Sequence, residues 1–329
     1  MLTAATDRRI DKLLRLLVAN ATVVLPGPKI ASEIGVTRST VWMWIEKLRR
    51  LGVEIRGHVA SGYQLMKLPD ILAPSLVRAE LGEGEMGKKI VHFFRTDSTN
   101  RVAQQLAAEA APHGTVVLAE EQTAGRGRFG RPWYSEATNG IYVSIIIRPP
   151  LAPTAAPVLT LMAAVAVQQA LSSAGFAPDI RWPNDVLING KKVCGILTEM
   201  NAELDRLYWL VLGIGLNVNH RVMPAELKEI ATSLQIETGK HFSRLQILAA
   251  LLKELQKIYR RLLAEGSQAV IRRWTAASSY AEGKRIRFVS QAGGTEAITA
   301  GLDLSGALRV RLDDGREELL TSGEVVEVK

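Results

Sequence analysis

Apolar residues in the first 65 positions recur at helical spacing and then give way to short alternating runs. This pattern predicts three helices and a two-stranded hairpin, over residues 11–20, 29–34, 37–51 and 53–65. Gly35 ends the second helix, and Thr37 or Ser39 can cap the third. A helix, a tight turn with glycine, a second helix and a hairpin predict a winged helix-turn-helix domain, whose recognition helix enters the major groove of DNA.

The middle of the chain mixes buried strands with helices, whereas its end contains only strands. Strands are predicted over 90–94, 115–122, 141–147, 180–188, 191–199 and 208–212, and helices over 75–81, 101–110, 160–174, 244–263 and 270–277. Four short strands follow, as in a small β-barrel: 285–289, 297–302, 307–311 and 325–328. The sequence therefore predicts an α+β fold in three domains, residues 1–67, 68–282 and 283–329.

Positive charge is concentrated in the first of these domains. Residues 1–67 hold 11 Lys or Arg against 5 Asp or Glu, which gives +6 of the net +8 of the 329-residue chain. A basic segment on a nearly neutral body is the electrostatic footprint of a nucleic-acid-binding domain. Together with the helix pattern, the charge favours DNA binding over a basic surface without a partner or a small helical dimerisation domain.

The single cysteine, Cys194, excludes an internal disulfide framework and a multi-cysteine metal site. We expect no apolar run long enough to span a bilayer, and the charged N-terminus is unlike a secretory signal. A reducing, cytoplasmic setting without a membrane partner follows. Cys194 is expected to be a small buried residue, because no neighbouring residue pattern marks it as a nucleophile.

Residues 122–131, Gln-Thr-Ala-Gly-Arg-Gly-Arg-Phe-Gly-Arg, alternate three glycines with three arginines. Glycine lets the backbone approach a ligand, and arginine offers paired donors to phosphate or carboxylate oxygens. The stretch also matches the dinucleotide fingerprint G-x-G-x-x-G, which requires a helix to begin at the glycines. Here Pro132 and Trp133 follow, and then a turn and a strand; no P-loop motif occurs in the chain. The stretch is therefore predicted to be a flexible anion-binding loop.

Three further segments place polar or small residues beside predicted strands. Residues 97–100, Asp-Ser-Thr-Asn, join a strand to a helix, where they either cap the helix or bind an uncharged polar ligand. Asn189-Gly190 predicts a hairpin that sets Asp185 opposite Lys192, either as part of a phosphate-and-metal site or as a rim salt bridge. Residues 213–219 alternate glycine with apolar residues, which predicts a backbone against which another group packs closely.

In this order and spacing the motifs resemble those of biotin–protein ligases of the bifunctional kind, which also act as the repressor of the biotin operon. The resemblance covers essentially the whole chain and is carried by residues 97–100, 122–131, 181–185, 192, 195–197 and 213–217. It implies a central mixed-sheet domain like that of class II synthetases and a C-terminal SH3-like barrel. It also implies a ligase that activates biotin with ATP and transfers it to a lysine of a carrier protein.

The resemblance further implies which residues bind the substrates. Around the biotin head group it places Ser98, Thr99, Asn100 and Gln122, and the loop residues Gly125, Arg126, Gly127 and Arg128 would close over biotin and the adenylate. Contacts with the adenylate would come from Trp133, Gly195 and Asn217. Lys192 would approach the biotin carboxylate and the α-phosphate, and Asp185 would help to place ATP and its Mg²⁺. Lys192, Arg128 and Asp185 are thus the expected catalytic residues, with no metal fixed by the protein alone and no permanently bound cofactor.

Candidate DNA contacts lie on the third predicted helix. Its leading end carries Arg38, Ser39, Thr40, Trp42 and Met43, and its far end carries Arg49 and Arg50, which could reach phosphates. Trp42 and Met43 are unusual readers of base edges. The resemblance implies three partners: a biotin carboxyl carrier protein as acceptor, operator DNA, and a second copy of the chain when the adenylate is bound.

The sequence departs from the family pattern in two places, and it leaves three other functions possible. Arg181 precedes Trp182 where the family often has Lys, and Pro132 is expected to stiffen the exit from the Gly/Arg loop. The other functions are a DNA-binding repressor that only senses a ligand, a lipoate or octanoate ligase, and a ligase whose winged helix no longer binds an operator. The adenylation residues argue against the first, and the winged helix and Gly/Arg loop disfavour the second.

Overall fold

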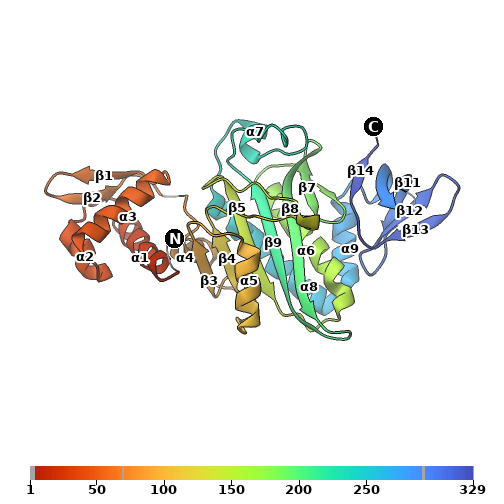
Figure 1. The fold of residues 1–329 in the computed structure, drawn as a ribbon, viewed down its shortest axis with the longest axis horizontal. Coiled ribbons are helices and arrows are strands. Elements are labelled where there is room, and N and C mark those ends of the chain that lie inside the picture. Colours follow the sequence, from red (N-terminus) through yellow and green to blue (C-terminus); the bar gives the residue numbers. More distant parts are fainter. Residues whose placement is uncertain (1–3, 69, 291–292, 329) are drawn as a thin grey trace.

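The structure, a computed structural model, describes residues 4–68, 70–290 and 293–328. Its N-terminal part contains three helices and an antiparallel hairpin: α1 (Ala4–Ala19), α2 (Gly27–Ile34), α3 (Arg38–Arg50), β1 (Ile55–His58) and β2 (Gly62–Leu65) (Figure 1). The Thr37 hydroxyl accepts a hydrogen bond from the Thr40 N–H at 3.2 Å and so caps α3, and Gly35 ends α2 with a φ of 78°. The predicted helix-turn-helix is thereby confirmed.

A seven-stranded mixed sheet in the order β3-β4-β5-β9-β8-β7-β6 forms the centre of the molecule. Its strands are β3 (Ile90–Phe93), β4 (Val116–Ala119), β5 (Gly140–Ile147), β6 (Asp179–Arg181), β7 (Asp185–Ile188), β8 (Lys191–Ala202) and β9 (Leu207–Asn217). Strands β3 and β4 are parallel, and the other neighbours are antiparallel. The expected α+β fold with a mixed central sheet is confirmed.

Successive side chains of the sheet point to opposite faces, and both faces are covered. Val117, Ile146 and Val211 pack with α5 (Thr99–Ala108) on one face. Their neighbours, among them Leu118 and Ile145, belong to the main core on the other face. The remaining helices are α4 (Pro74–Leu81), α6 (Ala156–Ser173), α7 (Leu234–Thr238), α8 (Arg244–Glu265) and α9 (Ser267–Ala276). The N-terminus of α5 reaches the glycines of β9, since the Asn100 side chain lies against Gly213.

The prediction that no apolar run is long enough to span a membrane is wrong for one helix, judged by its length and composition. Among the described residues one helical segment, Pro153–Ser173, is long and apolar enough to cross a bilayer, and 61% of its most apolar window is buried. The burial has a simple cause: α6 is apolar on all sides because the sheet covers one side of it and α8 and α9 pack against others. It is the core helix of the central domain.

A five-stranded antiparallel sheet in the order β13-β12-β11-β10-β14 ends the chain. Its strands are β10 (Glu282–Ser290), β11 (Gly293–Leu302), β12 (Leu308–Leu312), β13 (Glu317–Leu320) and β14 (Val325–Glu327). The sequence predicts four of these strands and misses β13, since Glu317 to Leu319 are all exposed and give no alternation. Residues such as Phe288 and Val310 share the main core with α6, and the Trp182 indole N–H donates to the Gly306 carbonyl oxygen at 3.0 Å.

The helix-turn-helix part is packed against the central domain. Asp11 of α1 accepts hydrogen bonds from the Ser75 N–H (3.0 Å) and hydroxyl (2.6 Å) at the start of α4. The Lys47 ammonium on α3 lies 3.8 Å from the centre of the Phe94 ring, just after β3. These contacts join the predicted DNA-binding helix to the strand that leads into residues 97–100.

Candidate active site

A cavity of about 220 Å³ opens on the side of the central sheet where β9 ends. Its wall combines the N-terminus of α5, the loop after β4, the turn between β6 and β7, strands β8 and β9, the loop before α7, and Glu324, which comes just before β14. The predicted residues that line it are Ser98, Thr99, Asn100, Gln122, Arg126, Gly127, Arg128, Trp133, Asp185, Lys192, Gly195 and Asn217. Segments that lie more than a hundred residues apart in sequence thus meet at one site.

The polar residues at the start of α5 form hydrogen bonds with the cavity wall. Gln122 Oε1 accepts from the Thr99 N–H at 2.9 Å and from the Thr99 hydroxyl at 3.1 Å, and Gln122 Nε2 donates to Ser135 Oγ at 3.0 Å. Asn100 Nδ2 donates to Glu199 at 2.7 Å. Ser98 holds the N-cap position, but its hydroxyl makes no capping bond. The capping interpretation of residues 97–100 therefore does not account for Ser98, which lies on the cavity wall.

Two glycines of β9 let side chains lie flat on the sheet. A Cβ atom at Gly213 would overlap the Asn100 side chain, and one at Gly215 would overlap the Trp133 indole. The prediction of a closely packed backbone over residues 213–219 is confirmed for these two positions. The indole N–H of Trp133 is buried and has no hydrogen-bond partner within the described residues, so a donor on the cavity wall is left for a ligand.

Asp185 and Lys192 face each other across the hairpin that Asn189-Gly190 closes, as predicted. Lys192 Nζ lies 2.6 Å from Asp185 Oδ1, and Arg181 Nη2 lies 2.7 Å from Oδ2 of the same carboxylate. The Asp185 side chain is 9% exposed and the Lys192 side chain 28%, so the carboxylate is buried between two cations and the ammonium reaches the cavity. Lys192 also lies 5.4 Å from the centre of a Trp133 ring. Two cations on one carboxylate leave net positive charge at this end of the cavity.

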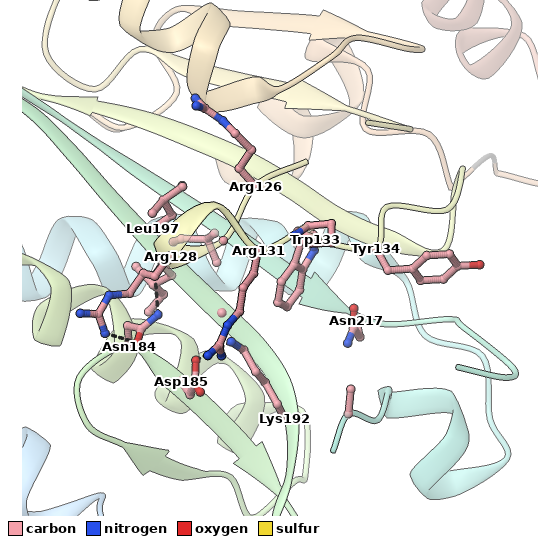
Figure 2. Close-up of a pocket in the computed structure, with 18 of the residues that line it drawn as sticks. Arg126, Arg128, Arg131, Trp133, Tyr134, Asn184, Asp185, Lys192, Leu197 and Asn217 are labelled. Carbon is pink, nitrogen blue, oxygen red and sulfur yellow. Dashed lines mark hydrogen bonds and ion pairs between the residues drawn. The ribbon is translucent and has the colours of Figure 1, made fainter. Parts of the chain in front are cut away.

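The three loop arginines point in different directions (Figure 2). Arg128 donates from Nη1 to Asn184 Oδ1 at 3.2 Å and to the Gly323 carbonyl oxygen at 2.8 Å, and burial lowers its pKa. Arg131 pairs with Glu324 at 2.8 Å. Arg126 extends away from both, toward Glu199 at 3.6 Å. The loop is thus tied to the connection between β13 and β14 on one side and to β8 on the other.

Of the residues predicted to bind the substrates, Gly125 is not on the cavity wall. Its carbonyl oxygen accepts a hydrogen bond from the Trp133 N–H at 2.8 Å and so closes the base of the loop. Asn184 lies within the motif at residues 181–185, but nothing in the sequence around it predicts its hydrogen bond with Arg128. Further wall residues absent from the predicted set are Arg131, Glu324, Met223, Leu227, Ile230 and Ala231. Asn217 Nδ2 donates to the Thr232 carbonyl oxygen at 3.0 Å and fixes the loop that supplies the last four.

The side chains of the described residues indicate which kind of ligand the cavity suits. They contain no group of three His, Cys, Asp or Glu side chains that could hold a metal ion. Cys194 is fully buried, so the prediction of a small buried residue is confirmed, and burial raises the pKa of its thiol. What remains is a cationic end at Lys192, a glycine-lined floor under Trp133, and amide and hydroxyl groups at α5. Such a site suits a ligand with a phosphate or carboxylate at one end and an uncharged polar ring at the other.

The predicted DNA contacts on α3 are exposed with one clear exception. Arg38, Ser39, Trp42, Met43 and Arg50 are exposed and Thr40 is half-buried. Arg49 instead turns inward, where its Nε donates to the Ile55 carbonyl oxygen at 3.0 Å and its Nη1 pairs with Glu46. The structure therefore gives Arg49 a role in holding the β1–β2 hairpin to α3, which is not the role of a phosphate contact that the sequence predicts.

Fold and site together define a helix-turn-helix domain joined to a ligase domain. The model of the biotin/lipoate A/B protein ligase family matches residues 93–217, and a model of HTH domains matches residues 9–64. The bifunctional ligase/repressor BirA of Bacillus spizizenii is 39% identical over 315 residues, which cover 94% of this chain and 96% of the relative. The Escherichia coli BirA is 27% identical over 87% of this chain and 88% of its own.

A solved structure shows the same central fold. The biotin protein ligase from Aquifex aeolicus in complex with biotin and ATP superimposes with a TM-score of 0.63 at 28% identity, and the match covers 74% of this chain and 99% of that one. The chain belongs to the family of the bifunctional ligase/repressor BirA. It is an ATP-dependent biotin–protein ligase with an N-terminal helix-turn-helix domain.

Proposed function

We propose that the cavity converts biotin and Mg²⁺-ATP to biotinoyl adenylate and then passes biotin to a lysine of a biotin carboxyl carrier protein. The observation that carries this proposal is the cationic end of the cavity, where Lys192 lies 2.6 Å from a carboxylate that Arg181 also neutralises. A carboxylate that attacks an α-phosphate brings two anions together, and a fixed cation in a partly enclosed site offsets their repulsion.

Each part of the proposed reaction has candidate residues on the cavity wall. The biotin carboxylate oxygen attacks the α-phosphorus, pyrophosphate leaves, and Lys192 stabilises the charge on the non-bridging oxygens. Thr99, Asn100 and Gln122 bound the end that takes the uncharged ureido ring, and the free Trp133 N–H is available to the intermediate. Mg²⁺ enters with ATP, and Asp185, a carboxylate on the cavity wall beside Lys192, is its candidate partner. The acceptor amine then attacks the acyl carbon, and AMP leaves.

The Gly/Arg loop is proposed to protect the intermediate. An acyl adenylate hydrolyses readily, so water must be kept out until the acceptor lysine arrives. In the structure, Arg128 and Arg131 are held by Asn184, Gly323 and Glu324, and Arg126 is held by Glu199. These are exchangeable partners for cations, and an anionic adenylate would compete with them. The loop would then close over its ligand, as lids in enzymes commonly do.

The finer architecture is part of the same proposal. The β1–β2 hairpin would be the wing of a winged helix, the central domain would be of the class II synthetase type, and the C-terminal sheet would be an SH3-like barrel, with domain limits at residues 67 and 282. A cytoplasmic setting agrees with the single buried cysteine. We propose that a homodimer loaded with adenylate binds operator DNA and represses biotin synthesis.

Biotin transfer is tested by mixing the protein with ATP, Mg²⁺, biotin and an isolated biotin carboxyl carrier domain. A streptavidin-reactive acceptor band is expected, and it should vanish when the acceptor lysine is replaced by arginine. Absence of a band with an intact acceptor contradicts the ligase proposal, and a product with lipoate but none with biotin assigns the site to the related ligases. A gel shift with DNA from upstream of biotin-synthesis genes, with and without biotin and ATP, tests the repressor proposal separately.

A further inference from the structure

The outward face of α3 has an apolar centre. Trp42 and Met43 leave 57% and 53% of their surfaces exposed, whereas Val41, Trp44 and Ile45 of the same helix are buried in the domain core. An exposed indole next to an exposed thioether is costly to leave in water on a domain that otherwise carries a basic surface. Two neighbouring exposed apolar side chains on the helix that is predicted to bind DNA make this face a candidate binding surface. We refer to Trp42 and Met43 as the apolar patch of α3.

Polar side chains around the apolar patch are engaged inside the domain. The Thr37 hydroxyl forms hydrogen bonds with Ser39 Oγ at 2.9 Å and with Thr40 Oγ1 at 2.8 Å. Arg49 is held by the Ile55 carbonyl oxygen and by Glu46. The hydroxyls near the leading end of α3 and Arg49 at its far end therefore already have partners within the domain. Between its ends, the most exposed side chains of α3 are the apolar Trp42 and Met43, whereas Glu46 is half-buried and pairs with Arg49.

Arg38 and Arg50 frame the apolar patch. Arg38 lies one turn before Trp42, and Arg50 lies two turns after it, near the end of the helix; both arginines are exposed. Cations at the ends of a helix in the major groove contact phosphates, and the side chains between them then face the base edges. The charge of the domain and the position of the arginines thus favour DNA over a protein as the occupant of this face.

Among the four bases, only thymine presents an apolar group in the major groove, its C5 methyl. We propose that Trp42 and Met43 are specificity-determining residues that read thymine methyl groups in the operator. This inference rests on the proposed repressor function. Removing one methyl group from such a contact is expected to weaken binding about fourfold.

The test separates the methyl group from every other feature of the base. A library of duplexes with a randomised centre is selected on the full-length protein with biotin, Mg²⁺ and ATP. The selected duplex is then made with thymine or with deoxyuridine at each thymine of a half-site, and affinities are measured by fluorescence anisotropy at one salt concentration. The double variant Trp42→Ala, Met43→Ala is compared with the wild type. Leu204→Ala is the matched control, because Leu204 is fully exposed (104%) in the turn between β8 and β9, outside the helix-turn-helix domain.

For the wild type and Leu204→Ala, replacing thymine by uracil at one or two positions is expected to weaken DNA binding about fourfold for each methyl group removed. The double variant is expected to bind the thymine and uracil duplexes equally. Biotinylation of the acceptor should be unchanged in the double variant, which shows that it is folded. If the wild type binds the thymine and uracil duplexes equally, the inference is overturned and the repressor proposal is unaffected. If the double variant changes in self-association but still binds the uracil duplexes more weakly than the thymine duplexes, the inference is likewise overturned. Failure to select any sequence contradicts the repressor proposal itself.

Discussion

Replacing Lys192 by alanine is expected to lower biotin-dependent pyrophosphate release about 10²- to 10³-fold, the usual cost of removing one charged or hydrogen-bonding group aimed at the transition state. Lys192 is the cation that reaches the cavity, whereas Arg181 is held on the far oxygen of Asp185. Because Asp185 keeps Arg181 as its partner in the variant, no buried carboxylate is left unpaired. The loss should therefore appear in the rate and not in the free energy of unfolding.

The neighbouring lysine provides a matched control. Lys191 donates from Nζ to the Lys228 carbonyl oxygen at 3.0 Å and does not line the cavity. Lys191→Ala removes the same side chain from the same strand and is expected to retain nearly full activity. Lys192→Arg keeps the charge with different geometry and should recover only part of the rate. Equal rates for Lys192→Ala and Lys191→Ala would exclude Lys192 from the reaction.

The second large effect is expected at Arg244, where Arg244→Met should destabilise the fold by about 3–5 kcal/mol at pH 7. The Arg244 side chain is fully buried at the start of α8 and lies 2.8 Å from Glu120 Oε2 and 3.1 Å from Asp70 Oδ2. Methionine fills a similar volume but leaves the Glu120 carboxylate buried without its cation. Urea unfolding of the variant and the wild type measures the difference.

The pH dependence identifies the cause of this loss. Burial alone would raise the pKa of Glu120, but Arg244, His92 and the Leu72 N–H hold it at about 2, against 4.5 for a free carboxyl. A lowered pKa stabilises the folded state above pH 4.5, and this contribution is lost as the pH falls toward 2. Without Arg244 the carboxyl would take up a proton more readily, so the gap between wild type and variant should narrow from pH 7 to pH 4.

A surface arginine of the same helix controls for the loss of charge. Arg260 pairs with Glu85 at 3.6 Å, and both side chains are about half exposed. Arg260→Met is expected to cost less than about 1 kcal/mol, as exposed pairs usually do. A loss for Arg244→Met as small as that for Arg260→Met would contradict the buried role of Arg244.

Arg244 also links stability to the arrangement of the two domains. Asp70 and Leu72 belong to the segment between the helix-turn-helix and the central domain, and Glu120 precedes Gln122 of the cavity by two residues. The same variant should therefore expose this segment, and faster cleavage there by a protease under native conditions is the expected result. Cleavage at the wild-type rate would indicate that other contacts, such as Asp11 with Ser75, suffice to hold the segment.

The sequence predicts the local structure of the site because each signal there is local. The doublet Asn189-Gly190 takes φ values of 51° and 76°, as a tight hairpin requires, and the hairpin brings Lys192 within reach of Asp185. The strand register itself pairs Lys192 with Leu187 and Asp185 with Gly195, with a register shift between them, so the ion pair runs diagonally across the hairpin. The spacing of Gly213 and Gly215 likewise predicts a close packing partner on one face of β9, although it does not identify Asn100 and Trp133.

What the sequence does not predict depends on contacts over long separations. Arg244 looks like the first polar residue of an amphipathic helix, and nothing near it indicates that it is buried beside Glu120. Glu324 joins Arg131 across 193 positions. The direction of Arg126 is set by Glu199 on another strand, so the alternation of glycine and arginine could not show that the three arginines diverge.

The central claim is that biotin reacts through an acyl adenylate at the cavity, and isotope transfer tests it most directly. Biotin labelled with ¹⁸O in its carboxylate is incubated with the protein, ATP, Mg²⁺ and the carrier domain, and the products are analysed by mass spectrometry. Attack of the carboxylate on the α-phosphorus followed by attack of the lysine on the acyl carbon leaves one labelled oxygen on AMP. We expect singly labelled AMP in amounts equal to the biotinylated carrier; unlabelled AMP, or ADP with labelled phosphate, would contradict the mechanism.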